Sequence, residues 1–153
     1  MFPDDCFRAL DREECLRLLA KVPVGRVVYT RQALPAVLPV NFCLDASEAA
    51  RAPGPPHAPD TCVVLCTSPG SGLVRAIDGV VVAFEADDFD GAARSGWSVV
   101  VTGRAGVVTD PAEHERLLQD GPKTWMPLEE IRFLRIEATL VTGREIRGMP
   151  GRG

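Results

Sequence analysis

Apolar and β-branched runs, separated by glycine and proline, recur along the chain and predict strands rather than long helices. The clearest runs are 99–102 and 107–109, with small residues between them. Together they predict one long strand that is buried over much of both faces and bends at Gly103 and Gly106. Trp97, at its entry, places a flat aromatic surface and one N–H donor near the mouth of whatever this strand encloses.

The same pattern predicts five more strands, at 25–30, 34–44, 62–67, 80–86 and within 131–146. Pro35 and Pro39 cannot donate to a ladder, so their strand lies at an edge or turns part of its backbone toward a ligand. The connection at 45–60 is rich in proline and alanine and is predicted to be a mobile hairpin tip. An acidic turn is expected at 87–91.

Three short helices are predicted from their starting residues. These starts are the capping box of Asp11 and Glu14, the Ser68-Pro69 pair, and the Asp110-Pro111 pair. The expected fold is therefore α+β and mainly β: a six-stranded antiparallel barrel with short peripheral helices. Residues 1–153 are expected to form a single domain with its core at about 10–146.

Composition and charge narrow the class of partner. At 153 residues the chain can bury a core without staples. Its net charge of -4 provides no basic field for nucleic acid or an anionic membrane surface. Apolar runs are too short to cross a bilayer, and the N-terminus lacks the regions of a signal peptide. A cytoplasmic protein with no membrane contact is therefore expected.

The five cysteines and two histidines are predicted to form neither a disulfide framework nor a metal site. Cys62 and Cys66 share one face of a predicted strand but are too far apart for an easy disulfide. Neither His57 nor His114 is near a pair of cysteines in the sequence. Buried, reduced thiols are the expectation.

Four short motifs follow one another along the chain: LPVNF at 38–42, TSPGSGL at 67–73, VAFEAD at 82–87 and GWSVVVTGRA at 96–105. In this order and spacing they resemble the pyridoxamine 5'-phosphate oxidase-like flavin-binding split barrels. The resemblance is to their small actinobacterial branch, related to nitroimidazole-resistance reductases, and runs from about 10 to 146. It implies a six-stranded split barrel and a homodimer with two flavin mononucleotide (FMN) sites at the subunit interface.

The resemblance also implies which residues contact the cofactor. By this resemblance, Pro39, Val40 and Asn41 would line the isoalloxazine edge. Thr67 and Ser68 would contact the ribityl-phosphate. Trp97 and Ser98 would come from the long strand of the partner subunit.

The residues after Thr67 support a phosphate site through their own chemistry. Ser68, Ser71 and Gly72 would present hydroxyls and free N–H groups at a helix N-terminus, where the dipole favours an anion. Plain N-capping by Ser68 is the alternative. Relatives commonly carry Lys or Arg where this chain has Gly72, and Arg75 is the candidate substitute cation. Losing that cation would weaken flavin binding by roughly ten- to a hundredfold.

Two aromatic residues and one amide have alternative interpretations. Asn41 either hydrogen-bonds a ring carbonyl or satisfies a neighbouring loop. Trp97 is otherwise a core or dimer-interface aromatic residue. Trp125 either covers a pocket or packs under a loop. Glu85 and Asp87 alternate on a strand and are interpreted as an ordinary solvated hairpin end.

The leading functional hypothesis is an FMN-dependent oxidoreductase that acts on an unidentified small molecule, with NAD(P)H as the candidate hydride donor. No motif identifies a protein acid or base. Oxidation of pyridoxamine phosphate itself would need a second basic phosphate site, which no Arg/Lys cluster supplies. The alternative is a non-catalytic module that binds or senses flavin, deazaflavin or haem, or a relative that has lost its cofactor.

Overall fold

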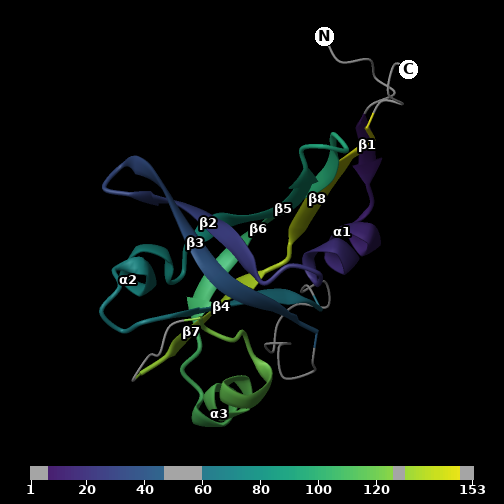
Figure 1. The fold of residues 1–153 in the computed structure, drawn as a ribbon. Coiled ribbons are helices and arrows are strands. Elements are labelled where there is room, and N and C mark those ends of the chain that lie inside the picture. Colours follow the sequence, from purple (N-terminus) through teal and green to yellow (C-terminus); the bar gives the residue numbers. More distant parts are fainter. Residues whose placement is uncertain (1–6, 47–59, 126–129, 149–153) are drawn as a thin grey trace, which may run out of the picture.

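The computed structural model describes residues 7–46, 60–125 and 130–148, which form a mainly antiparallel β structure with three short helices (Figure 1). The elements are β1 (Phe7–Leu10), α1 (Arg12–Leu19), β2 (Val24–Arg31), β3 (Leu34–Asp45), β4 (Cys62–Thr67), α2 (Leu73–Ile77), β5 (Val81–Asp90), β6 (Ser95–Val107), α3 (Pro111–Asp120), β7 (Arg132–Glu137) and β8 (Leu140–Ile146). Most of the proline-rich connection predicted at 45–60, namely 47–59, lies outside the described residues.

Six of the strands close into a barrel. They follow the order β6-β5-β2-β3-β4-β7, and pairing of β7 with β6 completes the ring. The strands β8 and β1 continue the sheet from the other half of β6. This arrangement confirms the predicted class, a mainly β split barrel with peripheral helices.

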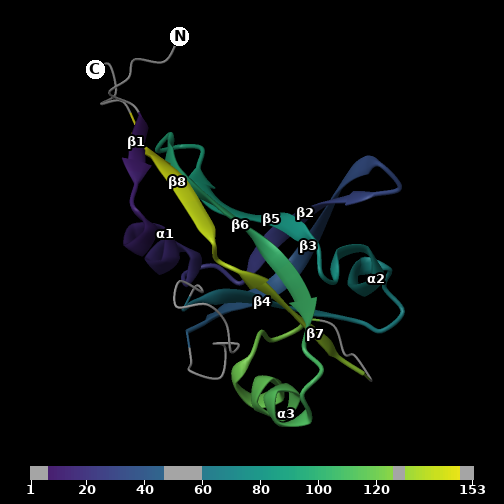
Figure 2. The same cartoon turned by 180° about the vertical axis from the view of Figure 1, so that it is seen from behind.

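The long strand β6 joins the two parts because its halves have different partners. Residues 96–102 pair with β8, and residues 105–107 pair with β7. Figure 2 shows β6 running from beside β8 at one end to beside β7 at the other. Gly103 lies where the partner changes, and a Cβ there would collide with the carbonyl oxygen of Glu137. Gly106, the other glycine of the predicted bend, has open space around it.

The number of strands differs from the prediction, eight instead of six. The strand expected within 131–146 is two strands, β7 and β8, which enter different parts of the sheet. The strand β1 was not predicted, because it has four residues, three of them exposed, and no alternating pattern. The predicted acidic turn is also wrong at its start, since β5 continues to Asp90 and pairs there with Ser95.

The helices α1 and α3 begin where their caps predict. The Asp11 side chain accepts from the Glu14 N–H, and the Glu14 carboxylate accepts from the Asp11 N–H. Asp110 caps α3 by accepting from the Glu113 N–H. Both helices therefore begin with a local signal that needs no tertiary contact.

The start of α2 was predicted too early. Its N-cap is Gly72, which makes no side-chain capping bond, and its five residues begin at Leu73. Ser68 belongs to a preceding turn, where its carbonyl accepts from the Ser71 N–H. Leu73 and Ile77 are buried, so burial of these two side chains determines the position of α2.

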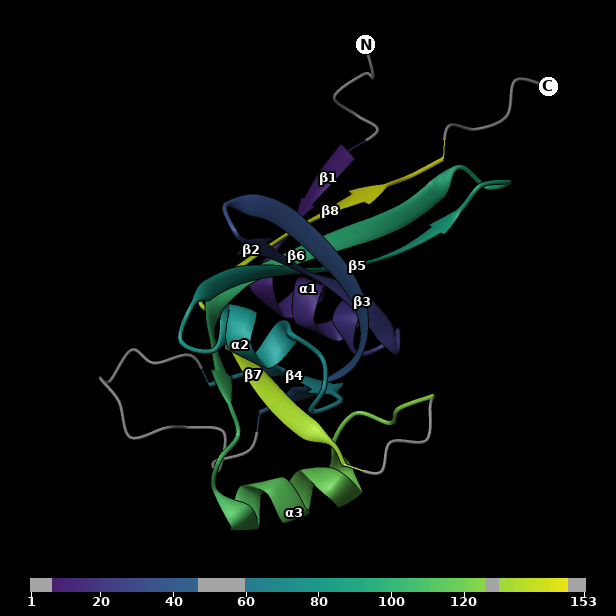
Figure 3. The same cartoon turned by 90° about the vertical axis from the view of Figure 1, so that its left-hand side faces the viewer.

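Two apolar clusters fill the fold. The larger lies inside the barrel and includes Val27, Phe84 and Leu134. The smaller lies between α3 and the outward side of β4 and β7, around Val64 and Phe133. Figure 3 shows α3 on this side, and α1 and α2 beneath the strands β5, β6 and β8.

The described cysteines agree with the expectation of reduced thiols. Cys15, Cys62 and Cys66 are buried, Cys43 is half-buried, and all four are free. Burial raises the pKa of the Cys43 thiol to about 11, so the thiolate is scarce at neutral pH. Within residues 7–46, 60–125 and 130–148, no metal-binding group of His, Cys, Asp and Glu occurs. No helix in those same ranges is long and apolar enough to span a membrane.

Candidate functional site

The turn between β4 and α2 gathers most of the residues predicted to contact phosphate. Thr67 ends β4 with its side chain largely buried, and its Oγ1 lies 2.6 Å from the Ser71 Oγ. One hydroxyl must donate in this pair, so the other keeps its hydrogen for a further acceptor. Ser68 is half-buried beside them. Because α2 begins at Leu73 and not at Ser68, the turn does not offer Ser68 as a helix N-terminus. Its hydroxyl groups are therefore its main polar feature.

A cation that was not predicted lies over the end of this turn. A Cβ at Gly72 would be 3.6 Å from both Nη1 and Nη2 of Arg31, the last residue of β2. Arg75, the predicted substitute, is exposed on α2. Gly72 has φ -71, a conformation open to any residue. No sequence motif indicates Arg31 as a phosphate ligand, because Arg31 and Gly72 are far apart in the chain and become neighbours only in the folded structure.

Pro39, Asn41 and Ser98 lie on one outward surface of the barrel. Strand register places Pro39 beside Arg26, Arg26 beside Glu85, and Glu85 beside Val100. We call this surface the open face, and it is formed by Val24, Arg26, Val28, Val37, Pro39, Asn41, Ala83, Glu85, Asp87, Ser98, Val100 and Thr102.

The buried side chains of the described helices lie elsewhere: those of α1 and α2 are in the barrel core, and Leu117 of α3 is in the smaller cluster (Figure 3). Val37 remains 60% exposed although it pairs with Val28 within the β2–β3 ladder, and such exposure is unusual for a large apolar side chain in a strand. Asn41 and Ser98 are three strands apart, about 14 Å at ordinary strand spacing. One chain therefore cannot bring both side chains to the same edge of a ring.

Two predicted residues point the other way. Val40 is 7% exposed and belongs to the barrel core, so its backbone alone is accessible to a ligand. Trp97 is half-buried and packs against the same core, on the opposite side of β6 from Ser98. The structure thus separates Trp97 from Ser98, although the two are adjacent in sequence.

A charged group in the middle of the open face corrects the interpretation of Glu85 and Asp87. Both side chains are partly buried on β5, and Arg26 Nη1 lies 3.2 Å from Asp87 Oδ2 and 3.6 Å from Glu85 Oε2. Glu85 Oε1 is buried and, without a proton, has no hydrogen-bond donor among the described residues. Burial, together with the adjacent Asp87 carboxyl, raises the pKa of Glu85 to about 7. This is not a solvated hairpin end.

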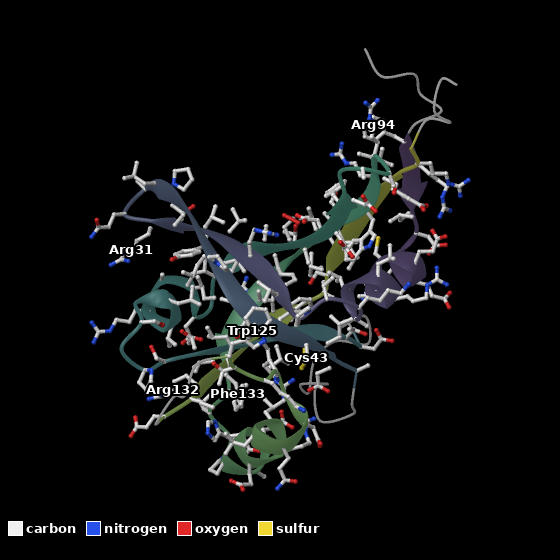
Figure 4. The ribbon with its side chains drawn as sticks, in the orientation of Figure 1. Arg31, Cys43, Arg94, Trp125, Arg132 and Phe133 are labelled. Carbon is white, nitrogen blue, oxygen red and sulfur yellow. The ribbon has the colours of Figure 1, made fainter. Side chains whose placement is uncertain are left out.

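Trp125 is held beside Asn41. Its backbone N–H donates to Asn41 Oδ1 at 3.4 Å, while its side chain is 72% exposed (Figure 4). Packing under a loop is therefore excluded within the described part of a single chain. The bond satisfies one side of the Asn41 amide and leaves its NH₂ group to donate elsewhere.

Two hollows among the described residues lie away from these side chains. One, of about 400 Å³, is lined by the end of α1 and by Phe42, Cys43 and Leu44 of β3. Another, of about 720 Å³, lies between α3 and the start of β7 and includes His114 and Arg132. None of the residues predicted to bind cofactor lines either of these two hollows.

Known proteins match this chain along most of its length. Residues 11–145 match the family model described as pyridoxamine 5'-phosphate oxidase. The uncharacterized protein Rv0080 of Mycobacterium tuberculosis is 44% identical over 143 residues, which cover 90% of this chain and 84% of that protein.

Solved structures agree with this match. The FAD-binding protein from Mycobacterium smegmatis is 31% identical, with a TM-score of 0.73, covering 92% of this chain and 98% of that one. The conserved protein of unknown function DIP1874 from Corynebacterium diphtheriae is 33% identical, also with a TM-score of 0.73, covering 93% and 99%. The resemblance of the four motifs is confirmed, and the chain belongs to the pyridoxamine 5'-phosphate oxidase family.

Proposed function

We propose that this protein binds a flavin nucleotide, FMN or FAD, and uses it as an oxidoreductase acting on a small molecule. The observation that carries the proposal is the likeness, over 92% of the chain, to a protein of known FAD-binding character. The residues of this chain fit such a cofactor. Hydroxyl donors gather at the β4–α2 turn, and apolar side chains with one amide lie on the open face.

Each part of the flavin has a suitable environment. Thr67 and Ser71 present a hydroxyl hydrogen to the phosphate, and Ser68 is adjacent. The NH₂ group of Asn41, whose oxygen accepts from the Trp125 N–H, donates to an acceptor at the edge of the ring. Pro39 supplies an apolar contact beside it. When bound, the flavin supplies hydride and electron transfer, while the protein positions the ring and limits access of water.

A second copy of the chain is part of this proposal. The open face leaves Val37 exposed, and Ser98 is too far from Asn41 to serve the same ring within one chain. A homodimer that packs these faces together would bury the apolar side chains and bring Ser98 of one copy toward Asn41 of the other. The substrate and the hydride donor would then enter at the boundary between the copies.

A non-catalytic flavin-binding module is the second candidate, because the resemblance implies a basic residue at position 72, where this chain has glycine. The discriminating experiment is the absorbance spectrum of the purified protein, followed by titration with FMN, FAD and riboflavin. Oxidoreductase function predicts a flavin spectrum that is bleached by NADH or NADPH without oxygen and recovers in air. A stable flavin spectrum that neither donor bleaches favours the binding module, and the absence of any flavin binding contradicts both.

A further inference from the structure

Arg31 places a guanidinium where a longer side chain at position 72 would begin. Its Nη1 and Nη2 are both 3.6 Å, and its Cζ 3.7 Å, from the position of a Cβ on Gly72. In Figure 4 Arg31 projects from the β2–β3 hairpin toward α2. The charge that a basic residue would bring to this position is therefore supplied from another strand.

The hairpin fixes the place of Arg31. Arg31 pairs with Leu34, and the two residues between them, Gln32 and Ala33, both have positive φ, 50 and 64. Two successive residues in this region form the tight turn that suits the twist of a two-residue hairpin. Arg31 thus ends a regular strand, and its Cα position is determined by ladder bonds on both sides of the turn.

The guanidinium is available for a ligand. In residues 7–46, 60–125 and 130–148, the side chain of Arg31 has no hydrogen bond or ion pair. Arg26, Arg116 and Arg135 differ, since each pairs with carboxylates. A free guanidinium presents several N–H donors in a planar fork that matches the oxygens of a phosphate.

The surrounding groups suit the same anion. Thr67 and Ser71 form a hydroxyl pair with one hydrogen left to donate, in the turn that leads directly to Gly72. No carboxylate is bound to Arg31 among the described residues, so an anion need not displace one. A guanidinium and two hydroxyls form this anion site, and the short helix α2 need not contribute to it.

We propose that Arg31 binds the phosphate shared by FMN and FAD, and so replaces from β2 the basic residue that relatives carry at position 72. This inference rests on the proposed flavin function and assigns its phosphate contact. Two other arginines compete for the role. Arg75 follows on α2, and Arg132 lies opposite Thr67 in the β4–β7 ladder.

The test compares Arg31→Gln with Arg75→Gln and Arg132→Gln in the full chain. Dissociation constants for FMN, FAD and riboflavin are measured by quenching of flavin fluorescence at low ionic strength. Because Arg31→Gln removes one charged phosphate contact, the dissociation constants for FMN and FAD should rise by about ten- to a hundredfold. Riboflavin, which lacks phosphate, should bind as it does to the parent, and the two control variants should change little.

A second variant distinguishes the loss of a phosphate contact from a loss of folding. Gly72→Lys in the Arg31→Gln background returns a cation to the same place, and φ at Gly72 permits it. This double variant should recover most of the lost FMN affinity, with melting temperature as the check on folding. The Arg31 assignment is overturned if Arg31→Gln keeps the parent ratio of FMN to riboflavin affinity, or if the loss follows Arg75 or Arg132. If the parent binds none of the three flavins, the proposed function itself fails, and this assignment with it.

Discussion

Two outward surfaces of the same barrel differ in whether a helix of the same chain covers them. The surface of β4 and β7 is covered by α3, and its apolar residues form a closed cluster around Val64, Leu117 and Phe133. The open face of β2, β3, β5 and β6 has no described helix over it and leaves Val37 exposed. The first surface is covered by a helix of the same chain, and the second is left to solvent in the described part of a single chain.

The charges follow the same division. Under α3, Asp45 Oδ2 accepts from Arg116 at 2.7 Å and from Arg135 at 2.8 Å, and Glu113 pairs with both arginines. On the open face, Arg26 is shared between Glu85 and Asp87, and the pKa of Glu85 is raised to about 7. Ion pairs to two arginines link α3 to the sheet, whereas the open face holds a carboxyl that is poorly stabilised as an anion in the single chain.

The largest expected effect is on assembly. Val37→Asp places a charge on the β3 side of the open face, where burial against a second copy would cost several kcal/mol. We expect the dimer to become a monomer at micromolar concentration in sedimentation velocity, with melting temperature as the folding check. Leu118→Asp, on the exposed side of α3, is the matched control and should leave the dimer intact. A folded Val37→Asp protein that sediments as the parent does would contradict the assignment of this face.

The next largest effect is on stability, and it comes from a substitution in the charged network under α3. Asp45→Ala leaves Arg116 and Arg135 with Glu113 as their remaining carboxylate, so two partly buried positive charges face one negative charge. We expect a loss of about 3 kcal/mol in the free energy of unfolding. Urea denaturation measures it, with Asp88→Ala, an exposed carboxylate of β5, as control. A loss below about 1 kcal/mol would mean that the network contributes little to holding α3 in place.

The smallest effect is the pH dependence of the open face. Because the pKa of Glu85 rises from 4.5 to about 7 on folding, the folded state favours the protonated carboxyl. Its contribution to stability is fully present below pH 4.5 and is lost as the pH rises through about 7.

Glu85→Gln should remove that loss. We expect the free energy of unfolding of the variant, relative to that of the parent, to be about 1 kcal/mol higher at pH 8 than at pH 5. This value is reduced for the partial exposure of the side chain. Arg26 on β2 and Asp87 on β5 are the charged groups that face Glu85, and Val100 on β6 is uncharged. Glu115→Gln on α3 serves as control. An equal change in both variants would show that Glu85 is solvated in the folded protein.

The parts of this molecule that were predictable from sequence are those with local causes. The caps at Asp11 and Asp110 are read from neighbouring residues, and the class follows from the apolar runs and the four motifs. Ser68 and Pro69 carried a local signal too, but the burial of Leu73 and Ile77 overrode it.

The candidate site was less predictable because its groups come from separate strands. Pairing of β2 with β5 brings Arg26 to Glu85, and no sequence spacing indicates that these two strands are neighbours. The β2–β3 hairpin likewise brings Arg31 to Gly72. The division of 131–146 into two strands depends on the change of partner along β6, which is a property of the closed barrel.

The central claim is that the open face is completed by a second copy and that flavin is bound where the two meet. Native mass spectrometry of the purified protein, saturated with FMN or FAD, tests it most directly. The account predicts a complex of two chains with two flavin nucleotides, and a Val37→Asp protein of one chain that retains no flavin. A single chain carrying its own flavin, or a dimer that takes up neither FMN nor FAD, would contradict it.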